Sequence, residues 1–171
     1  MLASELRRYA MDPSDLTLST DLTREDDVGM IVKGHIHIEY QLQQLACRVL
    51  PFPERCDWNK IGYRQTVELA LACGLPDDMR GTLNALGSLR NTFAHRLDAA
   101  LEKQRVMDLY NGLSDRLREG LKVAYAATGA KAEFRPVALS GKDLLILIFL
   151  SARQAIKAGI LALDDPSDFP E

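Results

Sequence analysis

The stretch Leu89-Arg90-Asn91-Thr92-Phe93-Ala94-His95-Arg96 decides the fold class, because it places a charged residue where helical periodicity requires an apolar one. At about 100° per residue, Arg90 falls within one apolar arc of a helix, which is formed by Met79, Leu83, Leu86, Leu89, Phe93 and Leu97. A guanidinium in such an arc faces a core and needs a partner, since an unpaired buried charge is costly and arginine keeps its proton.

The partner is expected on the first long amphipathic segment. A wide apolar arc of this segment contains Val28, Ile31, Val32, Ile36, Ile38, Leu42, Leu45, Ala46 and Val49. His35 and Glu39 lie near the middle of that arc and are i,i+4 neighbours on one helix face. We therefore predict that Glu39 accepts a bidentate pair from Arg90 and that His35 completes a small buried polar network.

Composition indicates one globular domain. The chain has 171 residues, of which 47% are hydrophobic and 26% charged, and a net charge of −3 gives no overall attraction to nucleic acid. The cysteines Cys47, Cys56 and Cys73 show no CxxC spacing and are expected as free thiols, which favours a cytoplasmic location. The apolar run 144–150 is too short to span a bilayer, which needs about 20 residues, so no membrane association is expected.

Neither a metal nor a cofactor is predicted. His35 and His37 fall on opposite faces of a helix and cannot hold one metal together. The glycines Gly29, Gly34 and Gly141 form no phosphate-binding motif.

Periodicity and capping signals predict a single-domain, all-α bundle of about five helices. The helices are expected at about 25–49, 58–73, 76–97, 102–127 and from Ser140 to about 162. Gly74 would stop the second helix, and Pro76 would open the third. Residues 1–22 are expected to form an N-terminal arm with at most a short helical turn, residues 23–162 the bundle and residues 163–171 a tail.

The last helix has an alternative. The run Leu144-Leu145-Ile146-Leu147-Ile148-Phe149-Leu150 fits a buried strand as well as a helix. A helix is preferred because the apolar pattern continues through Ile156 and Ile160, and because no second strand is available for pairing. Ser140 and Asp143 form a capping-box arrangement at its start.

A polar, uncharged stripe accompanies Arg90. Asn84, Ser88, Asn91 and His95 follow one another at helical steps outside the apolar arc. Solvated faces usually carry lysine and glutamate, so this stripe is typical of a subunit contact or a site. A face against a neighbouring loop explains the pattern equally well.

These residues resemble the HEPN superfamily, whose nuclease members carry an arginine, a polar residue, a short spacer and a histidine near the end of a helix. Arg90, Asn91 and His95 match that pattern one by one. The long first helix and the Gly74–Asp78 turn are similar more specifically to the mannitol operon repressor family. The resemblance covers residues 25–125, roughly, and implies a HEPN-like helical bundle that forms a homodimer.

The resemblance implies two different functions. Mannitol-repressor-like members are regulators without a recognised DNA-binding helix-turn-helix, so they are expected to act through protein partners, and direct DNA binding is doubtful. Nuclease members cut RNA without a metal by attack of a ribose 2′-hydroxyl, and some act as toxins that a protein antitoxin restrains. In such an enzyme His95 would transfer a proton, Arg90 would stabilise the phosphorane and Asn91 would orient either group.

Helix geometry favours the regulator. Arg90 and His95 are five residues apart, or about 140° around a helix, so they converge only through fraying or across two protomers. A pair with Glu39 would also neutralise Arg90 in part. The sequence therefore predicts that the motif braces the bundle of a regulatory protein, with the ribonuclease as the alternative. Many mannitol-repressor-like chains lack the arginine and histidine pair, which leaves the alternative open.

Overall fold

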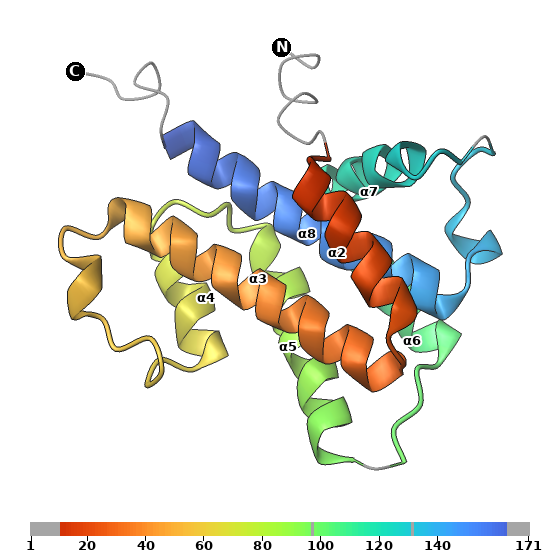
Figure 1. The fold of residues 1–171 in the computed structure, drawn as a ribbon, viewed down its shortest axis with the longest axis horizontal. Coiled ribbons are helices and arrows are strands. Elements are labelled where there is room, and N and C mark those ends of the chain that lie inside the picture. Colours follow the sequence, from red (N-terminus) through yellow and green to blue (C-terminus); the bar gives the residue numbers. More distant parts are fainter. Residues whose placement is uncertain (1–10, 97, 131, 164–171) are drawn as a thin grey trace.

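The computed structural model describes residues 11–96, 98–130 and 132–163 (Figure 1). These residues form seven α-helices, two short 3-10 helices and no strand, which confirms the all-α fold but exceeds the predicted number of helices. The elements in chain order are α2 (Pro13–Arg24), α3 (Asp27–Val49), η1 (Pro53–Arg55), α4 (Tyr63–Ala72), α5 (Met79–His95), α6 (Lys103–Asn111), α7 (Asp115–Ala127), η2 (Pro136–Ala138) and α8 (Gly141–Leu163).

One extra helix comes from a break in the expected fourth helix. Gly112 ends α6, and Ser114 begins α7 as its N-cap, with its side chain accepting from the Leu117 N–H. The apolar residues on either side of the break continue at helical spacing, so the sequence pattern alone conceals it. The low helix propensity of Gly112 is the local cause.

The other extra helix is α2, which occupies part of the region expected to be an arm. Asp12 caps α2, accepting from the backbone N–H groups of Ser14 and Asp15, and Pro13 occupies its first turn. Its buried residues are Asp15, Leu18 and Leu22, too few to produce a clear periodic signal. Residues 1–10 and 164–171, which include most of the expected tail, lie outside the described residues.

Helix α8 is the core of the fold. The run 144–150 is helical and fully buried, and Ser140 bonds both the N–H and the carboxylate of Asp143 as its capping pattern predicts. Helices α2, α3, α6 and α7 pack around α8. Among the described residues α8 alone is long and apolar enough to cross a membrane by length and composition, and 72% of its most apolar window is buried, as in a core helix.

The crossing of α3 and α8 is close because Gly34 has no side chain. A Cβ atom at Gly34 would lie 2.7 Å from the ring of Phe149, which is itself 1% exposed. The apolar arc of α3 is narrower than predicted, since Val28, Ile36 and Val49 are exposed, at 46%, 57% and 43%. Val28 and Val49 lie near the two ends of α3, whereas Ile36 lies in its middle, on the exposed side of the helix.

Helices α4 and α5 pack on α3 and on each other. Gly74, at φ +102°, ends α4 as predicted. The end is a Schellman motif, in which the Leu75 N–H donates to the Ala70 carbonyl oxygen and the Gly74 N–H to that of Leu71. Helix α4 begins at Tyr63, later than predicted, because residues before it form turns. On α5 the predicted inward residues Met79, Leu83, Leu86, Leu89 and Phe93 are buried; Leu97 lies outside the described residues.

Candidate functional site

The buried imidazole of His35 is the centre of a polar cluster between α3, α4 and α5. The His35 side chain is 2% exposed, and its ring packs against that of Tyr63 with centroids 4.1 Å apart. The Tyr63 hydroxyl donates to the Leu83 carbonyl oxygen at 2.9 Å. A Cβ atom at Gly87 would lie 2.7 Å from the Tyr63 ring, so glycine at this position allows Tyr63 to sit against α5.

Burial controls the protonation of this cluster. Burial, aided by the positive charge of Arg90, lowers the pKa of His35 from 6.5 to about 4, so the imidazole is neutral at neutral pH. Burial also raises the pKa of Glu39, and Arg90 opposes that rise. The pKa of Tyr63 is raised by burial first and then by the charge of Glu39. The negative charge of Glu39 and the positive charge of Arg90 therefore both influence the pKa values within this cluster.

The predicted bidentate pair between Glu39 and Arg90 is not formed. Arg90 is half-buried, and its Nη1 donates to Asn91 Oδ1 at 2.9 Å; among the described side chains no ion pair joins it to Glu39. Glu39 Oε2 lies 4.0 Å from His35 Nδ1, which is too long for a hydrogen bond. The hydrogen bond between Arg90 and Asn91 lies at the exposed surface of α5. His35, Glu39 and Arg90 are thus neighbours that interact through space.

The polar stripe is exposed along α5. Asn84, Ser88, Asn91 and His95 are all solvent-accessible, and Asn91 and His95 are one helical turn apart. His95 is the last residue of α5, and the helix is regular up to it. The regular helix keeps the Cβ directions of Arg90 and His95 about 140° apart, so one protomer brings Arg90 to Asn91 and does not bring it to His95.

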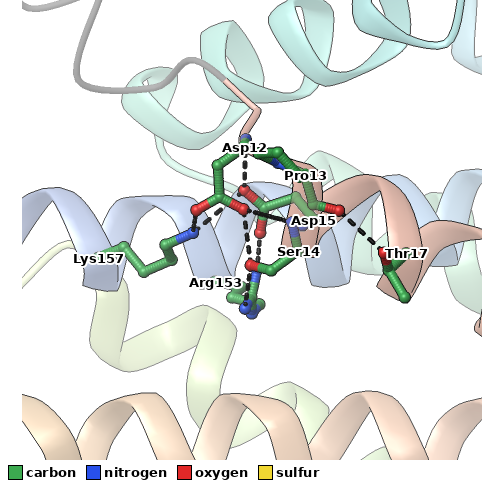
Figure 2. Close-up of polar contacts among 7 residues, drawn as sticks. All are labelled: Asp12, Pro13, Ser14, Asp15, Thr17, Arg153 and Lys157. Carbon is green, nitrogen blue, oxygen red and sulfur yellow. Dashed lines mark hydrogen bonds and ion pairs between the residues drawn. The ribbon is translucent and has the colours of Figure 1, made fainter.

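A second polar cluster, partly buried and not predicted from the sequence, joins α2 to α8 (Figure 2). Asp15 is 0% exposed and forms ion pairs with Arg153 and Lys157, and Lys157 also pairs with Asp12. Arg153 Nη2 donates to Ser14 Oγ at 3.0 Å. Arg153 itself was the available signal, because it is a cation within a long apolar helix. As for Arg90, a guanidinium at such a position needs a partner elsewhere in the chain.

Other site chemistries have little support. Across residues 11–96, 98–130 and 132–163 no group of three or more histidine, cysteine or acidic side chains could hold a metal ion. Cys47, Cys56 and Cys73 are free thiols, and burial raises the pKa of Cys47 and of Cys73. Neither thiol is therefore activated as a nucleophile.

Comparison of the chain with protein-family models, with curated proteins and with solved structures gave no match. Any assignment to a family therefore depends on the motif and helix order described above.

Proposed function

We propose that this protein is a regulatory interaction module, similar to mannitol operon repressor proteins and built on a HEPN-like helical bundle. It acts in the cytoplasm as a homodimer and through protein partners rather than through a DNA-reading helix. The observation that supports this proposal is the exposed stripe of Asn84, Ser88, Asn91 and His95 on α5.

The stripe has the character of a contact surface. It offers amide, hydroxyl and imidazole groups and no carboxylate, ammonium or guanidinium group that would have to be desolvated, and charged residues are depleted at the centres of interfaces. Helix α3, which packs on α5, also carries two large exposed apolar side chains, since Ile36 is 57% and Tyr40 53% exposed, although no contact joins them to the stripe among the described residues. Aromatic and apolar side chains of this kind supply much of the binding energy at subunit contacts.

The stripe also contains the position for a decisive substitution. Ser88→Arg places a charge in the middle of the exposed stripe, and we expect the dissociation constant of the dimer to rise at least about tenfold. Ala127→Arg, at the exposed end of α7, adds the same charge elsewhere and should leave dimerisation unchanged. Sedimentation velocity over a concentration series measures both. The proposal would be refuted if the wild-type protein were monomeric at every concentration, or if Ser88→Arg dimerised as tightly as the wild type.

A metal-independent HEPN-type ribonuclease is the second candidate. Arg90 is bonded to Asn91, and Asn91 shares an exposed face with His95, so these groups are accessible to a phosphodiester. In this reading two protomers complete the site: His95 accepts the proton of the 2′-hydroxyl as its oxygen bonds to phosphorus, Arg90 stabilises the phosphorane, and the bond to the 5′-oxygen breaks as that oxygen takes up a proton. The protein partner would then be an antitoxin.

Incubation of the purified chain with single-stranded RNA in EDTA separates the two functions. Cleavage that His95→Ala abolishes, with the circular dichroism spectrum unchanged, would favour the nuclease. Intact RNA, including total cellular RNA, would favour the regulator. Ala94→Gly, at the preceding exposed position of α5, controls for disturbance of the helix end.

A further inference from the structure

Basic side chains of α8 form ion pairs or hydrogen bonds with both ends of helix α2. Arg153 and Lys157 hold its N-terminal acids Asp12 and Asp15, and Lys142 donates to the carbonyl oxygens of Thr23, at 3.0 Å, and Glu25 (Figure 2 shows the N-terminal end). The two helices therefore run antiparallel. Acids at the N-terminus and a lysine at the C-terminus also match the dipole of α2.

The apolar contact beneath α2 is small. Leu18 and Leu22 are its buried apolar residues, whereas Leu16 is 46% exposed. Three threonine hydroxyls, of Thr17, Thr20 and Thr23, bond back to carbonyls of α2 itself, a pattern that slightly destabilises a helix. The position of α2 thus depends strongly on its ionic contacts.

The charges at the N-terminal end of α2 compensate each other only while both acids are ionised. Asp15 is fully buried and Arg153 is 7% exposed, so protonation of Asp15 would leave the guanidinium buried without its counter-charge. Burial raises the pKa of Asp12, but hydrogen bonds from Lys157 and Ser14 outweigh it and hold that pKa below its ordinary value. Stability from Asp12 is therefore present at neutral pH and is lost as the pH falls through its folded-state pKa.

The remaining charged groups along α2 lie nearer its other end. Glu25 pairs with Lys33 of α3, and the charge of Asp21 also acts on Lys33. Lys33 is exposed, so loss of this pair strands no buried charge. The acid-sensitive element is the Asp12, Asp15, Arg153 and Lys157 cluster.

We propose that α2 is a proton-sensitive latch on α8, which undocks on acidification while the rest of the bundle remains folded. Undocking uncovers a face of α8 that carries Arg153 and Lys157 among apolar residues, so the latch controls access to that face. The core of the bundle, where α3 and α7 pack on α8, contains no comparable cluster of buried acids among the described residues.

Amide hydrogen exchange of the full chain between pH 6 and pH 2 tests the latch, because a carboxyl group whose pKa lies below the ordinary 3.8 takes up its proton only below that pH. We expect the protection factors of residues 13–24 to collapse at a higher pH than those of α3 and α8, because few apolar contacts hold α2 once its ion pairs are lost. Loss of protection in all three helices at one pH would overturn the proposal.

Two variants make the test specific. Asp15→Asn should lower the protection of α2 at pH 7 at least about tenfold and leave α3 and α8 protected. The double variant Asp15→Leu/Arg153→Met replaces the buried pair by apolar side chains and should bring the acid midpoint of α2 to that of α3. Unchanged α2 protection in the first variant, or early loss of α2 in the second, would contradict the latch.

Glu68→Gln is the matched control, because it removes an exposed carboxylate that pairs with Arg80 away from α2. It should leave the acid midpoint of α2 where it is in the wild type. An equal shift in this control would show a general charge effect and would overturn the proposal.

Discussion

At the scale of single residues, the protonation of His35 is set by what surrounds it. Its ring lies between α3 and the Tyr63 ring, out of contact with water, and the Arg90 charge nearby disfavours an imidazolium further. An exposed histidine would bind protons near pH 6.5, whereas this one binds them near pH 4. Between these two pH values the unfolded chain binds a proton at His35 and the folded chain does not.

His35 should make the protein less stable in mild acid. Between pH 6.5 and about 4 the unfolded state binds more protons at this residue, so the free energy of unfolding falls as the pH falls. We expect a loss of about 2 kcal/mol between pH 7 and pH 5 from this residue, from the linkage of the two pKa values. Urea titrations at both pH values measure it, and in His35→Gln the loss should be largely absent. Equal pH dependence of the two proteins would contradict the prediction.

Arg90 should act on its neighbours through space. Removal of its charge in Arg90→Met is expected to raise the pKa of His35 by less than about one unit, because burial, the larger cause, remains. The pKa of Glu39 should rise as well, since Arg90 opposes the effect of burial there. Nuclear magnetic resonance titration of the His35 ring and the Glu39 carboxyl group reports both changes. Unchanged pKa values of both groups would show that the charge of Arg90 does not reach the cluster.

At the scale of the elements, glycine determines how closely two helices approach. Gly34 lets the backbone of α3 rest on the Phe149 ring of α8, whereas Gly81 on α5 has no heavy atom near the position of a Cβ. The same substitution therefore has opposite consequences at the two sites.

Gly34→Ala should destabilise the protein and Gly81→Ala should stabilise it. Alanine improves helix propensity at both positions, by about 0.5–1 kcal/mol. At Gly34 the new methyl group would overlap a buried ring, at a cost of about 1–3 kcal/mol that outweighs the gain. Urea denaturation gives both values, and the double variant Gly34→Ala/Phe149→Leu should lose less than the sum of the single losses. Stabilisation by Gly34→Ala would mean that the crossing of α3 and α8 is wider than the structure has it.

At the scale of the whole molecule, charge bears on the choice among functions. A net charge of −3 on 171 residues repels a polyanion in the absence of a local basic surface. Three of the basic side chains, Arg153, Lys157 and Lys142, are engaged in holding α2. The cations on α8 are therefore covered while α2 is docked.

The chain should bind duplex DNA very weakly at neutral pH. We expect a dissociation constant above about 100 µM at physiological salt, weaker than the usual range of non-specific DNA-binding proteins. Fluorescence anisotropy with a labelled random duplex measures it. Tight binding with a steep dependence on salt concentration would instead favour a direct DNA-binding repressor.

Local signals in the sequence determined the elements with the strongest patterns. The inward arc of α5, the stop at Gly74 and the capping of α8 by Ser140 follow from residues within a few positions of one another. Helix periodicity and capping are local properties, and neighbouring residues are enough to specify them. The helical state of the run 144–150 was predicted for the same reason, since the pattern extends beyond it.

Tertiary structure alone decided which polar groups meet. Periodicity puts Arg90 and Glu39 on inward faces, but the Arg90 guanidinium donates to Asn91, its neighbour in the sequence, and no ion pair joins it to Glu39 among the described side chains. Arg153, a cation within an apolar helix, indicates that a partner is needed, but only the docking of α2 on α8 decides that this partner is Asp15, which lies far away along the chain. Periodicity says which face of a helix is buried, whereas the partner of that face is set by the packing of the whole chain.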